Sequence, residues 1–241
     1  MASGMRGIVL SDELFKQYYD FKSKQDFDEK KVKAMFHYFK DKLYTNLRQY
    51  KQHGIEPENQ SLKNQLAHNS NKRKSVEELA KETIYKIVLT TDRDTFPYVN
   101  VLSGTDKIEN CLYGGYDNGE NRTKAIEHIK AVCEDARKII VYDNYFDQVA
   151  DNVNTLIDLL PRHRLELHCY KITTEQEARL KSAYADWNVI RETRDEKKHD
   201  RYLVVDDNVE ILLSSGFDHL GSIDKDFAYV IRPINRSRFI Y

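Results

Sequence analysis

The stretch that decides the fold runs from His199 to Asp218 and reads HDRYLVVDDNVEILLSSGFD. Its pattern predicts an apolar strand, a tight polar turn at Asp206-Asp207-Asn208, a second apolar strand and a Ser-Ser-Gly corner. Side chains alternate between the two faces of a strand, so His199 and Arg201 are expected on the same face.

This pairing of residue types predicts a phosphate site. The guanidinium of Arg201 can neutralise phosphate oxygens, and a neutral imidazole at His199 can act as nucleophile or proton carrier. Asp206 falls in the predicted turn, and Ser214 and Ser215 end the second strand. These five residues form the candidate catalytic set.

The spacing His-x-Arg-x4-Asp resembles the His-x-Lys-x4-Asp signature of the phospholipase D superfamily, with Arg201 in place of the lysine. A closer resemblance is to the phospholipase-D-like C-terminal module of MIT-domain proteins. In that module a His-Asp-Arg triplet precedes a hairpin, a Gly-Leu-Asp corner and an Arg-Pro pair. The matching residues here are His199-Asp200-Arg201, Gly216-Phe217-Asp218 and Arg232-Pro233, and the Asp143–Phe146 turn is similar to the module's Asp-Pro-Tyr turn.

The resemblance covers the chain from about Ile139 to Pro233 and implies a phospholipase-D-like half-domain. Asp143 and Tyr145 follow a predicted strand end, where sites on open sheets gather. Together with Asp218 and His219 they form the candidate substrate-binding set. Enzymes of the superfamily need two motif copies and this sequence contains one. Catalysis would therefore require a homodimer that brings two copies of His199 together.

Two functions stay open on these residues. The first is a homodimeric, metal-independent phosphodiesterase, and the resemblance to small single-motif members favours a nuclease. The second is a non-catalytic module that holds a phosphate group of a lipid, a nucleic acid or a protein partner. The arginine in place of lysine and the absence of the family's asparagine after Ser214 count against catalysis. A purely structural ion-pair network is a third interpretation.

Composition limits the partners. Lys and Arg total 38 against 39 Asp and Glu, so a nucleic-acid or lipid-phosphate surface must be a local patch such as Lys72-Arg73-Lys74. Three cysteines without Cys-x-x-Cys spacing favour a reducing cytoplasm. No apolar run reaches the roughly 20 residues that span a bilayer, although peripheral contact with lipid headgroups stays open. No cofactor and no metal are expected, because no residues show ligand spacing.

The sequence predicts an α/β fold with a mixed β-sheet flanked by helices over residues 76–241, preceded by a helical region and linker over 5–75. An apolar stripe from Val32 to Tyr50 predicts a helix whose face either packs on its own domain or forms a dimer seam. Residues 56–75 read as a polar linker, and Gly114–Asn121 as a loop. From Lys138 onward the expected order is strand, helix, strand, helix and four strands.

Overall fold

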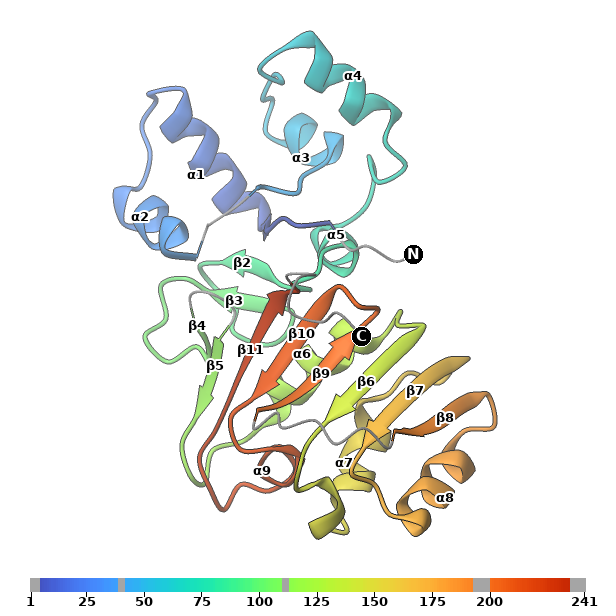
Figure 1. Ribbon diagram of the computed structural model, residues 1–241. Helices are drawn as coiled ribbons and strands as arrows, with labels where there is room; N and C mark the ends of the chain where they lie inside the picture. The colour runs from blue at the N-terminus through green and yellow to red at the C-terminus, as the bar shows by residue number, and fades with distance from the viewer. Residues whose placement is uncertain (1–4, 39–41, 110–112, 193–199, 235–241) are drawn as a thin grey trace. The chain divides into compact units, whose positions relative to one another are not determined.

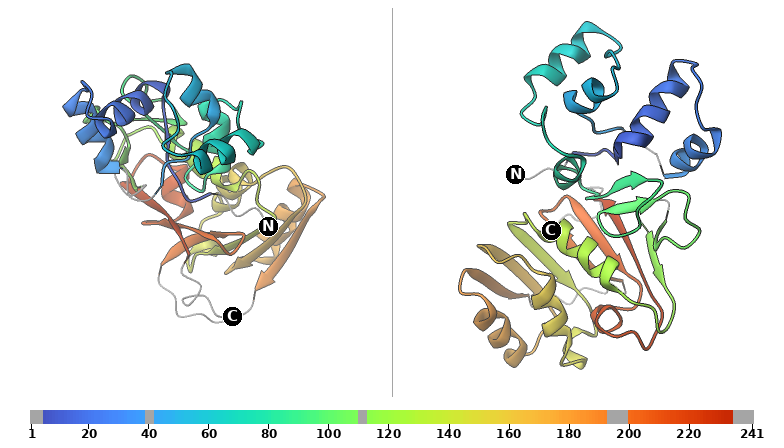
Figure 2. Two further views of the ribbon diagram at one scale, coloured as in Figure 1. Left: turned by 90° about the horizontal axis from the view of Figure 1, so that it is seen from above. Right: turned by 180° about the vertical axis from the view of Figure 1, so that it is seen from behind.

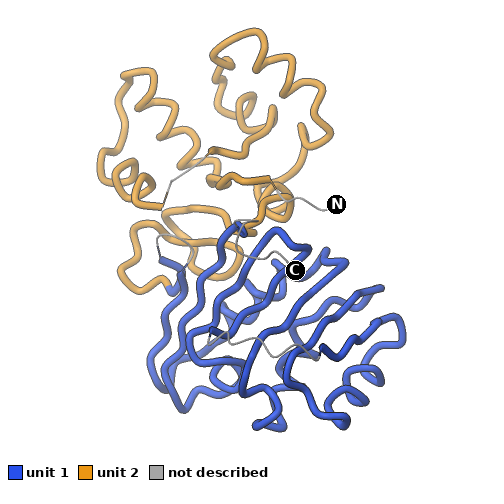
Figure 3. The backbone as a smooth tube through the Cα atoms, in the orientation of Figure 1, with its two compact units in different colours: residues 1–3, 107–241 blue, residues 4–106 orange. Residues whose placement is uncertain are grey.

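The computed structural model of the protein describes residues 5–38, 42–109, 113–192 and 200–234 (Figure 1). The chain divides between Asp106 and Lys107 into an N-terminal unit and a C-terminal unit (Figure 3). The sequence predicts this boundary after residue 75, and the structure places it later. The reason is a parallel sheet in which strands from both sides of residue 75 pair with each other.

The N-terminal unit combines that small sheet with helices. The sheet has the order β1-β2-β3 and is parallel throughout. Leu79 and Ala80 pack against Val9 and Val88 in its core. The elements are β1 (Val9–Leu10), α1 (Asp12–Lys22), α2 (Glu29–Tyr38), α3 (Leu47–Gln52), α4 (Gln60–His68), α5 (Val76–Glu82), β2 (Val88–Thr90) and β3 (Tyr98–Asn100).

Two sequence predictions in this unit are wrong. The stripe from Val32 to Tyr50 is not one helix, because its residues divide between α2 and α3, and Leu43 between them forms a β-bridge with Ile8. The dimer seam predicted from that stripe therefore loses its basis. The polar segment 56–75 is not a linker either, because it contains α4, which Asn59 caps by accepting a hydrogen bond from the amide of Leu62 at 2.8 Å.

The C-terminal unit is built on an eight-stranded sheet with the order β4-β5-β11-β10-β9-β6-β7-β8. The strands β6, β7 and β8 are parallel, and the other pairings are antiparallel. The helices α6, α7 and α8 lie on one face of this sheet (Figure 2). The elements are β4 (Ile108–Glu109), β5 (Tyr113–Tyr116), α6 (Thr123–Cys133), β6 (Lys138–Tyr142), α7 (Asn152–Leu159), β7 (Leu165–Tyr170), α8 (Thr174–Ala183), β8 (Trp187–Glu192), β9 (Arg201–Val205), β10 (Val209–Leu213), α9 (Phe217–Gly221) and β11 (Phe227–Pro233).

The predicted α/β fold with a mixed sheet is confirmed. The predicted loop at Gly114–Asn121 is wrong at its start, because Gly114 and Gly115 belong to β5. A Cβ atom on Gly114 would lie 2.2 Å from a ring carbon of Tyr229 on the neighbouring β11. Gly114 therefore makes room for the ring of Tyr229 on the sheet, a role that cannot be distinguished from a loop signal in the sequence.

The hairpin of β9 and β10 positions the candidate site. Leu203 and Ile211 face each other across it and are fully buried, so the apolar runs of both strands anchor the hairpin in the core. The same register sets Arg201 opposite Leu213, at the end of the hairpin remote from its turn. None of the helices in the described ranges is long and apolar enough to cross a membrane.

Candidate functional site

The candidate site lies at the ends of three central strands of the large sheet, where β6 and β10 end and β9 begins. Tyr142, the last residue of β6, pairs with Tyr202, and Leu213, the last residue of β10, pairs with Arg201. Antiparallel pairing therefore brings Asp143 and the Ser-Ser-Gly corner next to the start of β9.

The guanidinium of Arg201 is held by three contacts. Its Nε lies 3.4 Å from Oδ1 of Asp143, and its Nη1 donates a hydrogen bond to the carbonyl oxygen of Ser214 at 3.3 Å. Its Cζ lies 4.9 Å from the ring centroid of Tyr145. The side chain of Arg201 is nevertheless 24 % exposed, whereas that of Asp143 is 2 % exposed. The cation is thus fixed in orientation and still reachable from solvent.

Asp143 is the buried partner of this cation. Its Oδ1 accepts a hydrogen bond from the backbone amide of Tyr145 at 2.9 Å. Burial raises the pKa of Asp143 above its ordinary value, while the amide of Tyr145 and the charge of Arg201 lower it. The nearby carboxylate of Asp218 raises it further. Arg201 and the amide therefore stabilise an ionised carboxyl that its burial disfavours.

Gly216 occupies the centre of the cluster. Its φ is +94° and its ψ is −175°, a combination that only glycine adopts readily. A Cβ atom there would lie 2.9 Å from both Cδ of Arg201 and Oδ2 of Asp143, and 3.1 Å from Oδ1 of Asp218. The backbone passes between three charged side chains at this point. Gly216 is not in the predicted site set, and its only sequence signal is its place in the Gly-Phe-Asp corner.

Asp218 and His219 lie in the first turn of α9, which begins at Phe217. Nε2 of His219 lies 3.3 Å from Oδ2 of Asp218, and Nδ1 lies 3.2 Å from the carbonyl oxygen of Asp226. Asp218 therefore lies near Asp143 and Arg201 around Gly216, and His219 contacts this group through Asp218.

Ser214 contacts the cluster through its backbone carbonyl, and Ser215 contacts the hydroxyl of Ser214. Oγ of Ser214 accepts a hydrogen bond from the amide of Ala228 at 2.8 Å and lies 3.3 Å from Oγ of Ser215. Its hydroxyl thus joins the ends of β10 and β11, whereas its carbonyl oxygen contacts Arg201. Ser214 orients the arginine through its backbone.

Asp206 lies in the turn at the other end of the hairpin. Its Oδ1 accepts hydrogen bonds from the backbone amides of Arg137 and Lys138, both at 2.9 Å, and its φ is +48°. Five residues of strand at about 3.3 Å each place it roughly 16 Å along the chain from Arg201. The structure therefore separates Asp206 from the other site residues that it describes, and gives it a role in closing the turn.

His199 lies outside the described residues, so its role stays a prediction. Asp200, which links it to β9, is exposed. In the described ranges, no three histidine, cysteine or acidic side chains are grouped as a metal ion would need.

Comparison with known proteins shows no family. No family model matches the chain, and no curated protein matches it. Among solved structures, a similar one is "Structure of TrmBL2, an archaeal chromatin protein, shows a novel mode of DNA binding", with 11 % sequence identity and a TM-score of 0.27. The match covers 54 % of this chain and 48 % of that one, so the chain spans about half the length of that protein. At this TM-score the similarity carries no argument about fold or function.

Proposed function

We propose that the C-terminal unit binds a phosphate group through Arg201. The observation that supports this proposal is a partly exposed guanidinium fixed by the carboxylate of Asp143, the carbonyl of Ser214 and the ring of Tyr145. An arginine that is already oriented loses less conformational freedom when it binds, and its planar fork matches phosphate oxygens. The contacts to Asp143 and Ser214 use two of its five N–H donors.

The charges around the site favour contact with one phosphate group over contact with several neighbouring phosphates. Asp143 and Asp218 both lie close to Arg201, so the cluster has no excess of positive charge. Tyr145 is 50 % exposed beside the cation. Its ring offers a surface on which a base can stack, and stacking on aromatic rings is common in proteins that bind single strands. A phosphodiester of a nucleic acid therefore suits the site better than a bare phosphate ion.

Phosphodiester cleavage is a second candidate function, favoured by the pair of Asp218 and His219. In that reaction His199 would attack phosphorus, forming a P–N bond as the P–O bond to the leaving group breaks. A second imidazole would protonate the leaving oxygen, and water would then hydrolyse the phosphohistidine. His219 of the same chain can supply this proton, and in a homodimer His199 of a second copy can supply it instead.

Binding is tested by fluorescence anisotropy with a labelled single-stranded oligonucleotide of about 12 nucleotides. Replacing Arg201→Gln removes a charge-assisted contact that contributes about 1.5–3 kcal/mol, so we expect affinity to fall at least about tenfold. Arg164→Gln is the matched control, because Arg164 is an exposed arginine on the same unit. If both variants bind like the wild type, the phosphate proposal fails and the triplet is structural.

Cleavage is tested on the same oligonucleotide in EDTA with the wild type, His199→Ala and His219→Ala. Loss of product in both variants would support a single-chain reaction. Loss in His199→Ala alone would support the homodimer, which sedimentation can then verify. If the oligonucleotide binds in an Arg201-dependent way and yet stays uncleaved, both in EDTA and with added metal, that result would support a binding module without catalytic activity.

A further inference from the structure

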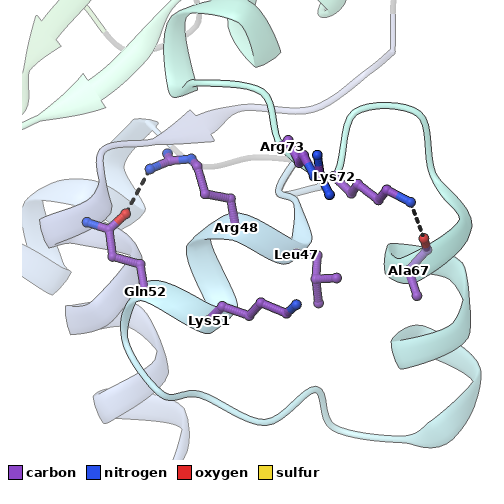
Figure 4. A pocket seen from close by; sticks show the side chains of 7 residues that line it. All are labelled: Leu47, Arg48, Lys51, Gln52, Ala67, Lys72 and Arg73. Atoms are coloured by element: carbon purple, nitrogen blue, oxygen red, sulfur yellow. Dashed lines mark hydrogen bonds between the residues drawn. The ribbon is translucent and has the colours of Figure 1, made fainter.

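The N-terminal unit contains a basic pocket that the proposed function does not use. Its volume is about 580 Å³, and α3, the end of α4 and the segment after α4 form its walls (Figure 4). Four of its lining residues are cations and none is acidic. The lining residues are Leu47, Arg48, Lys51, Gln52, Ala67, Lys72 and Arg73.

Three of these cations retain their charge without a carboxylate partner. Lys51, Lys72 and Arg73 are exposed, and within the described part of the chain none of them forms an ion pair with an acidic side chain. Nζ of Lys72 donates to the carbonyl oxygen of Ala67 at 3.3 Å, which leaves its charge uncompensated. In Figure 4, Lys51 extends from α3, and Lys72 and Arg73 come from the segment after α4.

Arg48 and Lys74 differ from these three. Nη1 and Nη2 of Arg48 each donate to a carboxylate oxygen of Asp12 at 3.0 Å, so its charge is balanced. Lys74, the third member of the basic cluster in the sequence, pairs with Glu82 and does not line the pocket. The excess positive charge is therefore concentrated on Lys51, Lys72 and Arg73.

Hydrogen bonds fasten the basic segment to α3. Nδ2 of the fully buried Asn46 donates to the carbonyl oxygens of Asn71 and Lys74 at 2.9 and 2.8 Å. The amide of Arg48 donates to the carbonyl of Lys72 at 3.1 Å, and its Nε to that of Lys74 at 3.1 Å. The same Asn46 caps α3 through Oδ1, which accepts from the amide of Gln49. One buried side chain thus fixes both walls that carry the cations.

We propose that this pocket binds the phosphate groups of a nucleotide, either free or as a unit of a nucleic-acid strand. Like charges held close together repel each other, and a bound polyphosphate relieves that repulsion while it gains three cationic contacts. Leu47 and Ala67 supply apolar surface for the sugar or base. The volume lies within the range of small-molecule sites, about 300–1,000 Å³. This site is independent of the one at Arg201.

Isothermal titration with ATP, inorganic phosphate and an oligonucleotide tests the proposal. The double variant Lys51→Gln/Arg73→Gln should lose at least about tenfold in ATP or oligonucleotide affinity. For the oligonucleotide, the slope of log Kd against log salt should fall by about 1.4, because two phosphate contacts are removed. Lys30→Gln/Lys33→Gln is the charge-matched control, since both lysines are exposed on α2 outside the pocket.

The probes separate the two sources of the phosphate. Tight binding of ATP with weak binding of the oligonucleotide indicates a free nucleotide. Oligonucleotide binding that is tighter than ATP binding and is weakened in Lys51→Gln/Arg73→Gln indicates a strand. Arg201→Gln should keep wild-type ATP binding, which distinguishes this site from the proposed function. If the double variant binds every probe as well as the wild type, or if the wild type binds none of them, the proposal is overturned.

Discussion

The two ends of the β9–β10 hairpin use aspartate in opposite ways. At the open end, Asp143 is buried beside Arg201, and burial raises the pKa of its carboxyl. At the turn, Asp206 receives two backbone amide hydrogen bonds from the start of the neighbouring β6. One end concentrates charged side chains around a reachable cation, whereas the other satisfies backbone donors. The His-x-Arg-x4-Asp motif therefore includes residues with different roles. Arg201 lies at the candidate binding site, whereas Asp206 stabilises the turn.

The largest loss of stability, together with a loss of phosphate binding, should come from Gly216→Ala at the open end of the hairpin. The backbone of Gly216 has a conformation that favours glycine, so an alanine there is strained. Its Cβ atom would also lie 2.9 Å from atoms of Asp143 and Arg201. We expect a loss of about 2–4 kcal/mol in the free energy of unfolding, measured with urea, and a loss of phosphate binding. Gly119→Ala is the control, because its φ is +81° but no atom lies within 4 Å. It should lose only about 1 kcal/mol. Equal losses in both variants would mean that the cluster is not tightly packed around Gly216.

A smaller effect on stability, with none on binding, is expected for Asp206→Ala at the turn. Two hydrogen bonds to a charged acceptor are lost, and the free energy of unfolding should fall by about 1.5–3 kcal/mol. Asp207→Ala provides the comparison, since Asp207 also has a positive φ but forms only an exposed ion pair with Lys138. That variant should lose under about 1 kcal/mol. Weaker phosphate binding in Asp206→Ala would show that the turn also contributes to the binding site at the open end of the hairpin.

The smallest effect is a pH dependence at Asp143. The folded protein retains the proton of Asp143 at a pH where the unfolded chain, with an ordinary value of 3.8, has lost it. This carboxyl therefore makes the protein less stable as pH rises from about 3.8 through its folded pKa. Urea unfolding across this range should show Asp143→Asn gaining stability relative to the wild type as pH rises. A loss of stability of Asp143→Asn relative to the wild type as pH rises would contradict the raised pKa.

Much of the C-terminal unit could be predicted from its sequence. The order of strands and helices from Lys138 onward follows from apolar periodicity, which is a local property of the chain, except that the short helix α9 between β10 and β11 is not predicted. Asp143, Tyr145, Arg201 and Asp218 were grouped through a family resemblance, and the structure brings them together. The resemblance itself stays a prediction, because no comparison supports it.

Other features depend on contacts that no local pattern records. The predicted strand and turn set Arg201 and Asp206 at opposite ends of one strand, but they do not show that Asp206 accepts hydrogen bonds from the amides of Arg137 and Lys138. The basic pocket also depends on such contacts. Lys72 and Arg73 stand out in the sequence, but Lys51 lies near them because hydrogen bonds from Asn46 and Arg48 fasten their segment to α3. The boundary at Asp106 also depends on a non-local pairing of strands.

The most direct test of the contrast between the two ends is one NMR titration of the ¹⁵N-labelled protein with dimethyl phosphate, a simple phosphodiester. The Nε–H signal of Arg201 is assigned by its absence in Arg201→Gln. The account predicts that this signal and the amide of Gly216 shift and reach saturation, whereas the amides of Arg137 and Lys138 beside Asp206 do not move. An unchanged Arg201 signal, or equal shifts at both ends of the hairpin, would contradict it.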